Sequence, residues 1–210
     1  MEVHAPHGAI NTWREFFIHL VIITLGLLIA LGLEGTVEWF HERHLLHTAE
    51  ANLRVELQQN RSAIIADLKS LDAAQKQAQS NMAILKAYRN KKKGEAREVN
   101  ISWQWNSPSS AAWDTARNTG AVALMDYQAA QKYSDTYTQQ SWVIEQSSAY
   151  LRDVNKSVGP LQGEEEISEA RPEDIDMALA NVQQTIADVL FLHDLCNALS
   201  HNYDETLNEH

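Results

Sequence analysis

The sequence predicts an all-α membrane protein with one N-terminal transmembrane helix that continues into a long stalk helix. Two or three further antiparallel helices are expected to pack on the stalk as an extramembrane bundle. Three observations predict this fold. Residues 16–33 are apolar and contain no Asp, Glu, Lys or Arg. Apolar residues then recur at seven-residue intervals. Glycine and proline, which interrupt helices, number only 8 and 4 in 210 residues.

Residues 13–40 are predicted to cross a bilayer, after a disordered tail at residues 1–12. At 1.5 Å per residue the apolar run spans about 27 Å, close to the ~30 Å hydrocarbon core. Trp13 and Trp39 are separated by about 39 Å of helix, so one indole reaches each headgroup layer. A cleaved signal peptide would need a basic N-terminal region and a shorter apolar run, and residues 30–32 form a poor cleavage site. A soluble helix that is apolar all round would need a large enclosing core.

The extramembrane bundle is expected to occupy residues 41–210, beginning with a helix at about 41–92. Leu57, Ile64 and Leu71 begin a seven-residue series that continues to residues 78 and 85. Such a narrow stripe is typical of a helical bundle or coiled coil. Asn60 and Gln75 interrupt the stripe and are candidates for fixing its register. Three lysines at residues 91–93 and a glycine at 94 suit a helix end.

After that helix end, residues 95–108 alternate like a strand and are interpreted as an extended cap at the far end of the bundle. Further helices are expected at about 109–120, 126–158 and 172–207. In the helix at 126–158, a second seven-residue series predicts the face that packs on other helices: Ala130, Tyr137, Ile144, Leu151 and Val158. Small serines fill the companion positions of that face, at Ser134, Ser141 and Ser148. These helices are expected to run up along the stalk, down, and up again. The acidic loop at 161–172 would then face the membrane.

Charge and composition restrict the partners of this chain. A net charge of −11 provides no basic face for nucleic acid. Cys196 is the single cysteine, so no internal disulfide forms, and no motif for a cofactor is present. The expected partners are the lipid bilayer and either a second copy or other membrane subunits. Gly26 and Ala30 form a small-xxx-small spacing that lets helices approach closely, although Gly and Ala are also common in membrane helices.

Two segments resemble an uncharacterised family of bacterial single-pass membrane proteins, known only as a domain of unknown function. The first is EFFIHLVIITLGLLIALGLEG, followed by a helix that contains EANLRVEL. The second is SAAWDTARNTGAVALMDYQAAQKYSDTY, at residues 110–137. The matching residues are Gly26, Leu27, Leu28, Ile29, Ala30, Leu31, Trp113, Ala116, Gly120 and Tyr133. The resemblance covers residues 13–60 and 108–140. It implies a bacterial inner-membrane protein with no assigned activity and no catalytic residues.

Several histidines are weak candidates for ligands. His19 lies inside the apolar run, where an ionisable residue is a functional candidate, although a neutral histidine near the interface is tolerated. Glu38, His41 and His44, with His47, form the other cluster. The spacing of Glu38 and His41 is used in di-iron bundles, but no second such pair exists. A titratable collar at the headgroups is the alternative, and plain solvation is favoured over both.

Two further sets of residues are candidates for chemistry or ligand binding. His193 and Cys196 share one face of the last helix, where a packed, inert thiol is favoured over a catalytic pair. Trp103, Trp105 and Trp113, with Tyr127, are expected at the far end of the bundle. There they would either line a ligand pocket or plug the bundle end, and the plug is favoured.

The predicted function is therefore non-enzymatic. The chain is expected to be an oligomerising, accessory or scaffold subunit of a membrane complex, in the bacterial inner membrane with its C-terminal domain in the periplasm. The first alternative is a periplasmic sensor-like bundle that binds a small ligand at the aromatic cap. The second is a metal or redox enzyme that uses the histidine collar.

Overall fold

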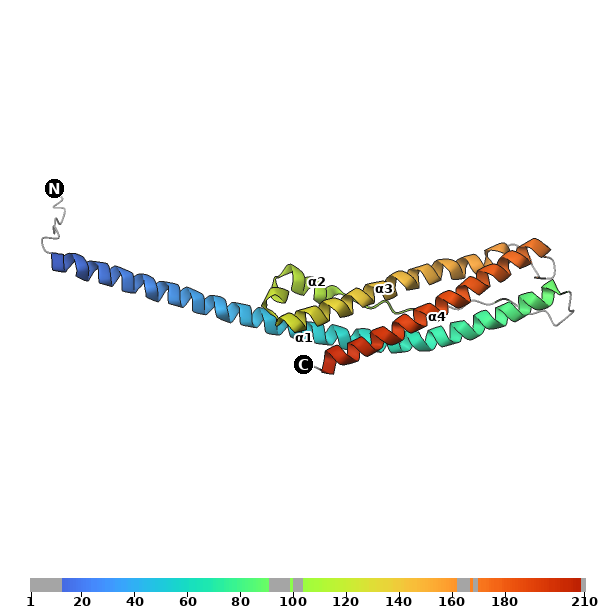
Figure 1. Cartoon of the computed structure of the whole chain (residues 1–210), viewed down its shortest axis with the longest axis horizontal. Helices are drawn as coiled ribbons and strands as arrows, with labels where there is room; N and C mark the ends of the chain where they lie inside the picture. The colour runs from blue at the N-terminus through green and yellow to red at the C-terminus, as the bar shows by residue number, and fades with distance from the viewer. Residues whose placement is uncertain (1–12, 91–98, 100–103, 162–166, 168–169, 209–210) are drawn as a thin grey trace, which may run out of the picture. The chain divides into compact units, whose positions relative to one another are not determined.

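The structure is a computed structural model and describes residues 13–90, 99, 104–161, 167 and 170–208 (Figure 1). It contains four α-helices: α1 (Trp13–Arg89), α2 (Ala111–Asn118), α3 (Tyr127–Val158) and α4 (Pro172–Asn208). Two short 3₁₀ helices follow α2 and α3: η1 (Ala121–Leu124) and η2 (Gly159–Leu161). The described residues include no strand, which confirms the all-α prediction. The chain divides into two compact units, Met1–Thr48 and Ala49–His210.

The N-terminal unit contains the first part of α1, and the apolar side chains of this part are exposed from Trp13 to Phe40. One stretch of this helix is long and apolar enough to cross a membrane, and none of that stretch is buried. Its polar side chains bind the backbone of the helix itself. The hydroxyls of Thr24 and Thr36 donate to carbonyls four residues earlier, at 2.8 and 2.7 Å. Nδ1 of His19 lies 2.7 Å from the carbonyl of Glu15, so this nitrogen carries the hydrogen. Backbone-satisfied polar groups are what a helix in lipid requires.

In the C-terminal unit the predicted stripe of α1 is buried. Leu57 and Ile64 are fully buried and Leu71 is nearly so, and residues 78 and 85 continue the series as buried positions. Heptad logic explains this pattern, because positions seven apart keep one face toward neighbouring helices. At the end of α1, Leu85 packs into a cluster with Ile175 and Leu179 of α4. The stripe therefore forms the α1 side of the core, as its spacing predicts.

The order in which the helices run differs from the prediction. Glu56 and Asn60 of α1 contact Tyr137 and Gln140 of α3, in increasing order along both helices, so α1 and α3 are parallel. α4 is antiparallel to both, as its contacts with α1 illustrate: Arg61 with Asp204, Asp72 with His193, and Arg89 with Asp176. The expected up, down, up path is therefore wrong for both helices: α3 runs up, parallel to α1, and α4 runs down. The η2 turn and the start of α4 lie at the Arg89 end of the bundle (Figure 1).

The downward path is made by a non-helical stretch, residues 104–110, which we call the return segment. Its Asn106 backbone N–H donates to Asp67 at 3.0 Å, and its Ser109 N–H donates to Asn60 at 2.8 Å. Seven helix residues rise about 10.5 Å, and three extended residues span about 10 Å. The heptad of α1 and the return segment are therefore in register. The predicted cap at the far end is wrong for residues 104–108, which lie along α1 instead.

The face that α3 buries also differs from the prediction. Tyr137 is buried as expected, but Ser134, Ser141 and Ser148 are exposed and Leu151 is 38% exposed. The buried residues instead include polar side chains among the apolar ones: Tyr133, Thr136, Gln140, Val143, Ser147, Tyr150, Val154 and Ser157. These polar groups tolerate burial because they are hydrogen-bonded, for example Thr136 to Thr206 at 3.0 Å. The seven-residue pattern of the sequence therefore predicted the wrong inner face for α3. The buried face of α4 includes residues 175, 179, 182, 189, 196 and 203.

Candidate functional site

The short helix α2 is held against the bundle by a carboxylate from another helix. Glu56 is 7% exposed and accepts hydrogen bonds from the Ser109 hydroxyl at 2.8 Å and the Ala112 N–H at 2.9 Å. The second contact satisfies one of the free N–H groups at the start of α2 and places negative charge there, where the helix dipole favours it. Beyond α2, Gly120 adopts φ 80°, a left-handed conformation that suits glycine. Glu56 and Gly120 thus fix the two ends of α2.

The same carboxylate holds an aromatic stack between α2 and α3. The Tyr137 hydroxyl donates to Glu56 at 2.7 Å. The Tyr137 ring lies 5.3 Å from the ring of Trp113, and the two planes differ by 6°. The Tyr133 ring also stacks with Trp113, with the ring centroids 6.4 Å apart. Burial, and the hydrogen bond to Glu56, raise the pKa of Tyr137 far above its usual value, so this phenol stays protonated and continues to donate.

A second buried network adjoins this stack. Asn60 donates to the Ser109 carbonyl at 2.7 Å and to Oε1 of Gln140 at 3.0 Å. The amide of Gln140 donates to the same carbonyl, and the Tyr203 hydroxyl donates to Gln140 Oε1 at 2.6 Å. Burial raises the pKa of Tyr203 well above its usual value, so it too remains a donor. This network ties α1, α3, α4 and the return segment together at one level.

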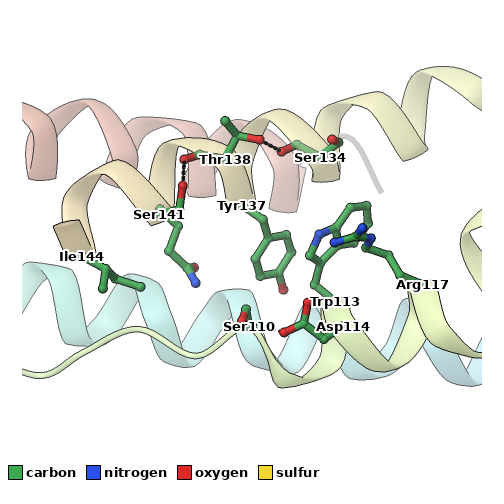
Figure 2. A pocket seen from close by; sticks show the side chains of 10 residues that line it. Ser110, Trp113, Asp114, Arg117, Ser134, Tyr137, Thr138, Ser141 and Ile144 are labelled. Atoms are coloured by element: carbon green, nitrogen blue, oxygen red, sulfur yellow. Dashed lines mark hydrogen bonds between the residues drawn. The ribbon is translucent and has the colours of Figure 1, made fainter.

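Next to these networks, α2 and α3 enclose a groove of about 440 Å³ (Figure 2). Its lining residues, which define the α2–α3 groove, are Ser110, Trp113, Asp114, Arg117, Ser134, Tyr137, Thr138, Gln140, Ser141 and Ile144. The hydroxyls of Thr138 and Ser141 donate to carbonyls of their own helix, at 2.8 and 2.7 Å. The charged groups of the lining are Asp114 and Arg117, both on α2 and both exposed. The groove is therefore polar, with one acid and one base.

The predicted aromatic cap does not exist as one cluster in the part of the chain that the structure describes. Trp103 lies outside the described residues. Trp113 lies beside Glu56, far along α1 from the expected position, because its helix is bound there. Trp105 precedes Asn106, which binds Asp67, and Tyr127 is 79% exposed. The prediction that Trp113 lies at the far end of the bundle is therefore wrong. Trp113 does line a groove, which is the α2–α3 groove.

The remaining predicted residues are located as follows. Gly26 and Ala30, with Trp13 and Trp39, lie on the exposed N-terminal part of α1. Trp13 packs on Phe17 at 4.9 Å, and the Arg43 guanidinium lies 5.8 Å from the Trp39 ring. Glu38, His41, His44 and His47 are also exposed. Among the described residues, no three His, Cys, Asp or Glu side chains are grouped so that they could hold a metal ion.

His193 and Cys196 are not arranged as a catalytic pair. Nε2 of His193 faces Asp72 at 3.3 Å, and its Nδ1 accepts from Asn197 at 3.0 Å. Cys196 is fully buried, and burial raises its pKa to about 12. At neutral pH the thiol is protonated, so it is a poor nucleophile. Its location agrees with the interpretation as a packed thiol.

Sequence reasoning missed Glu56, Asp114 and Arg117. Glu56 lies one position before the buried Leu57, and its charge made it resemble a solvated residue. Asp114 and Arg117 are an ordinary i,i+3 pair on a helix surface. The available indication was that Glu56 adjoins the buried stripe, which places it at the edge of the core.

Comparison of this chain with protein-family models, with curated proteins and with solved structures finds no match. The resemblance to a membrane family therefore stays a prediction, and the function must be argued from the molecule.

Proposed function

We propose that this chain is a non-enzymatic, single-pass membrane protein that serves as an accessory or scaffold subunit of a membrane complex. In this proposal, residues 13–40 cross the bilayer and the C-terminal unit is presented on one side, in the periplasm of a bacterial inner membrane. The observation that carries the proposal is the complete exposure of the apolar stretch of α1. A soluble protein would leave this large apolar surface in water, which is strongly unfavourable.

Three local features support a lipid environment for this stretch. Thr24, Thr36 and His19 satisfy their hydrogen-bonding groups on their own helix. Aromatic residues gather at both ends, Trp13 with Phe16 and Phe17, and Trp39 with Phe40. The sequence between them contains no charged side chain from residue 16 to 33. These are the requirements of a membrane-spanning helix with interfacial anchors.

Self-association is the more specific part of the proposal. A Cβ added at Gly26 meets no atom of the described residues within 4 Å, so no packing contact among them requires glycine there. A close helix–helix contact between copies would give Gly26 and Ala30 a reason to be small. The stripe of Leu57, Ile64 and Leu71 is occupied within the chain, so association is assigned to the membrane helix alone.

Membrane insertion is tested by alkaline extraction of membranes from cells that produce the full chain. We expect the protein to remain in the membrane pellet. A variant with Leu25→Arg and Leu28→Asp, which places charges in the span, is expected to lose this retention. Release of the wild-type protein by alkali would contradict insertion.

Self-association is tested by native mass in nanodiscs, with Gly26→Leu/Ala30→Leu compared with the wild type. We expect a dimer or larger assembly for the wild type and a monomer for the variant. Gly32→Leu is the control, because it adds the same bulk about 120° around the helix, also without a steric clash. A wild-type monomer without any co-purifying subunit rules out the scaffold role.

A further inference from the structure

We propose that the α2–α3 groove binds a small zwitterion that carries one carboxylate and one ammonium group, such as a free α-amino acid. The inference goes beyond membrane anchoring, because the groove lies wholly in the C-terminal unit and is formed by residues 110–144. Its success or failure is therefore independent of the association of residues 13–40.

The α2 wall of the groove carries one negative and one positive side chain, Asp114 and Arg117. Asp114 and Arg117 are three residues apart, a spacing at which opposite charges on a helix commonly pair. No ion pair joins them, and neither forms an ion pair with another described residue. Among the described residues, the Asp114 carboxylate accepts one hydrogen bond, from the Ser110 hydroxyl at 2.9 Å. Both charges therefore remain available to a ligand in the groove (Figure 2).

The opposite wall of the groove is formed by α3 and adds no further charge. Thr138 and Ser141 donate their hydroxyl hydrogens to their own helix, so toward the groove they present lone pairs that accept hydrogen bonds. An ammonium group has three donors to use on such acceptors and on Asp114. A carboxylate has only acceptors and is matched by the guanidinium of Arg117. Ile144 supplies an apolar surface for a side chain at the end of the groove.

The charges of the groove and of the whole chain restrict the net charge of the ligand. A purely anionic ligand would be repelled by a chain of net charge −11 and by Asp114. A purely cationic ligand would face Arg117. A ligand with one group of each sign and no net charge satisfies both residues. The groove volume of about 440 Å³ is sufficient for an amino acid and lies in the usual range of small-molecule sites.

The residues that line the groove are held in place by contacts with the rest of the bundle. Trp113 and Tyr137 are stacked and buried behind the groove, and Gln140 is fixed by Asn60 and Tyr203. The N-terminus of α2 is held by Glu56. Because these supports are hydrogen-bonded before any ligand arrives, little ordering is required on binding.

The test is isothermal titration of the full chain in detergent with each of the free neutral α-amino acids. We expect saturable binding of at least one. Its N-acetyl form lacks the ammonium charge and its methyl ester lacks the carboxylate, so each is expected to bind about 10- to 100-fold more weakly. Absence of binding by every free amino acid, or equal binding of the blocked forms, overturns the proposal.

Two variants assign the binding to the groove. Arg117→Gln and Asp114→Asn are each expected to weaken binding of the free amino acid about 10- to 100-fold. Lys69→Gln and Glu173→Gln remove the same charges from exposed positions outside the groove and are expected to leave binding unchanged. Thermal unfolding of each variant verifies that it is folded. Wild-type affinity in both groove variants overturns the site, and the blocked ligands test the wild type without any substitution.

Discussion

The two parts of α1 reverse the usual relation between polarity and burial. In residues 13–44 the apolar side chains are exposed, and the described residues of the N-terminal unit include no buried position. From Ala49 onward the helix buries apolar residues, but it also buries Glu56, Asn60, Asp67 and Asn81. One helix therefore has a part whose outside is apolar and a part whose inside is partly polar.

The difference teaches that burial follows the available partner and not polarity alone. The return segment has no helix or strand to satisfy its backbone groups, so a buried wall facing it must supply donors and acceptors. Asn60 and Asp67, seven positions apart, do this. In the N-terminal part, polar groups such as the Thr24 hydroxyl bind the backbone of their own helix, as a helix in lipid requires.

The strongest way to break this comparison is Glu56→Ala. The substitution leaves the Tyr137 hydroxyl, the Ser109 hydroxyl and the Ala112 N–H without their acceptor. We expect the free energy of unfolding to fall by about 3 to 5 kcal/mol, measured by urea denaturation in detergent. Glu42→Ala, at an exposed position of the N-terminal part, is expected to change it by less than about 0.5 kcal/mol. Equal effects of both substitutions would remove the distinction between the two parts.

The second substitution is Asn60→Leu, which makes the stripe of α1 more apolar. Coiled-coil reasoning alone predicts stabilisation. We expect a loss of about 1 to 3 kcal/mol, because the partly buried Ser109 N–H and the buried Gln140 side chain each lose their bond to Asn60. Gln58→Leu, at an exposed position two residues away on the opposite side of the helix, serves as the control. A more stable Asn60→Leu protein would show that the return segment is not held by this residue.

The same chemical change can also be made in both parts of the molecule. Thr136→Val removes one hydroxyl of the buried pair with Thr206, and we expect a loss of about 1 to 2 kcal/mol in urea denaturation. Thr24→Val removes a hydroxyl that is bonded to its own helix and is expected to be almost neutral. A costly Thr24→Val would indicate that its hydroxyl has a partner on another helix.

The smallest expected effect concerns pH and Asp67. Burial raises the pKa of this carboxyl, and the hydrogen bonds from Asn106 only partly offset that rise. Because the folded state then holds the proton more tightly than the unfolded state, stability declines as pH rises from the usual aspartate pKa through the raised pKa. Asp67→Asn is expected to flatten this decline in unfolding measurements made at increasing pH from the usual aspartate pKa upward. Asp135→Asn, on an exposed position of α3, is the control, and an unchanged slope in Asp67→Asn argues against a raised pKa.

Much of the fold follows from the sequence because its strongest pattern is local. The series from Leu57 to residue 85 predicts both a helix and its buried face, and Pro172 marks the start of α4. The path of the chain through the bundle could not be predicted from the sequence. Asn60 and Asp67 pair with residues about 40 to 50 positions away, and those residues have no periodic pattern. The inner face of α3 was missed because Gln140 and Ser147 are buried while Ile144 lies at an edge. The groove requires the structure, since its two charges resemble any surface pair.

The equal step lengths of helix and return segment restrict how this molecule changes in length. A heptad added to α1 between Asn60 and Asp67 shifts their backbone partners apart by about 10 Å, which three extra residues between Asn106 and Ser109 restore. α3 and α4 must each gain a heptad as well to keep their contacts. Insertions of other sizes leave a buried amide or carboxylate opposite the wrong peptide. Homologous bundles of this design are therefore expected to differ in length by matched sets of seven, three, seven and seven residues.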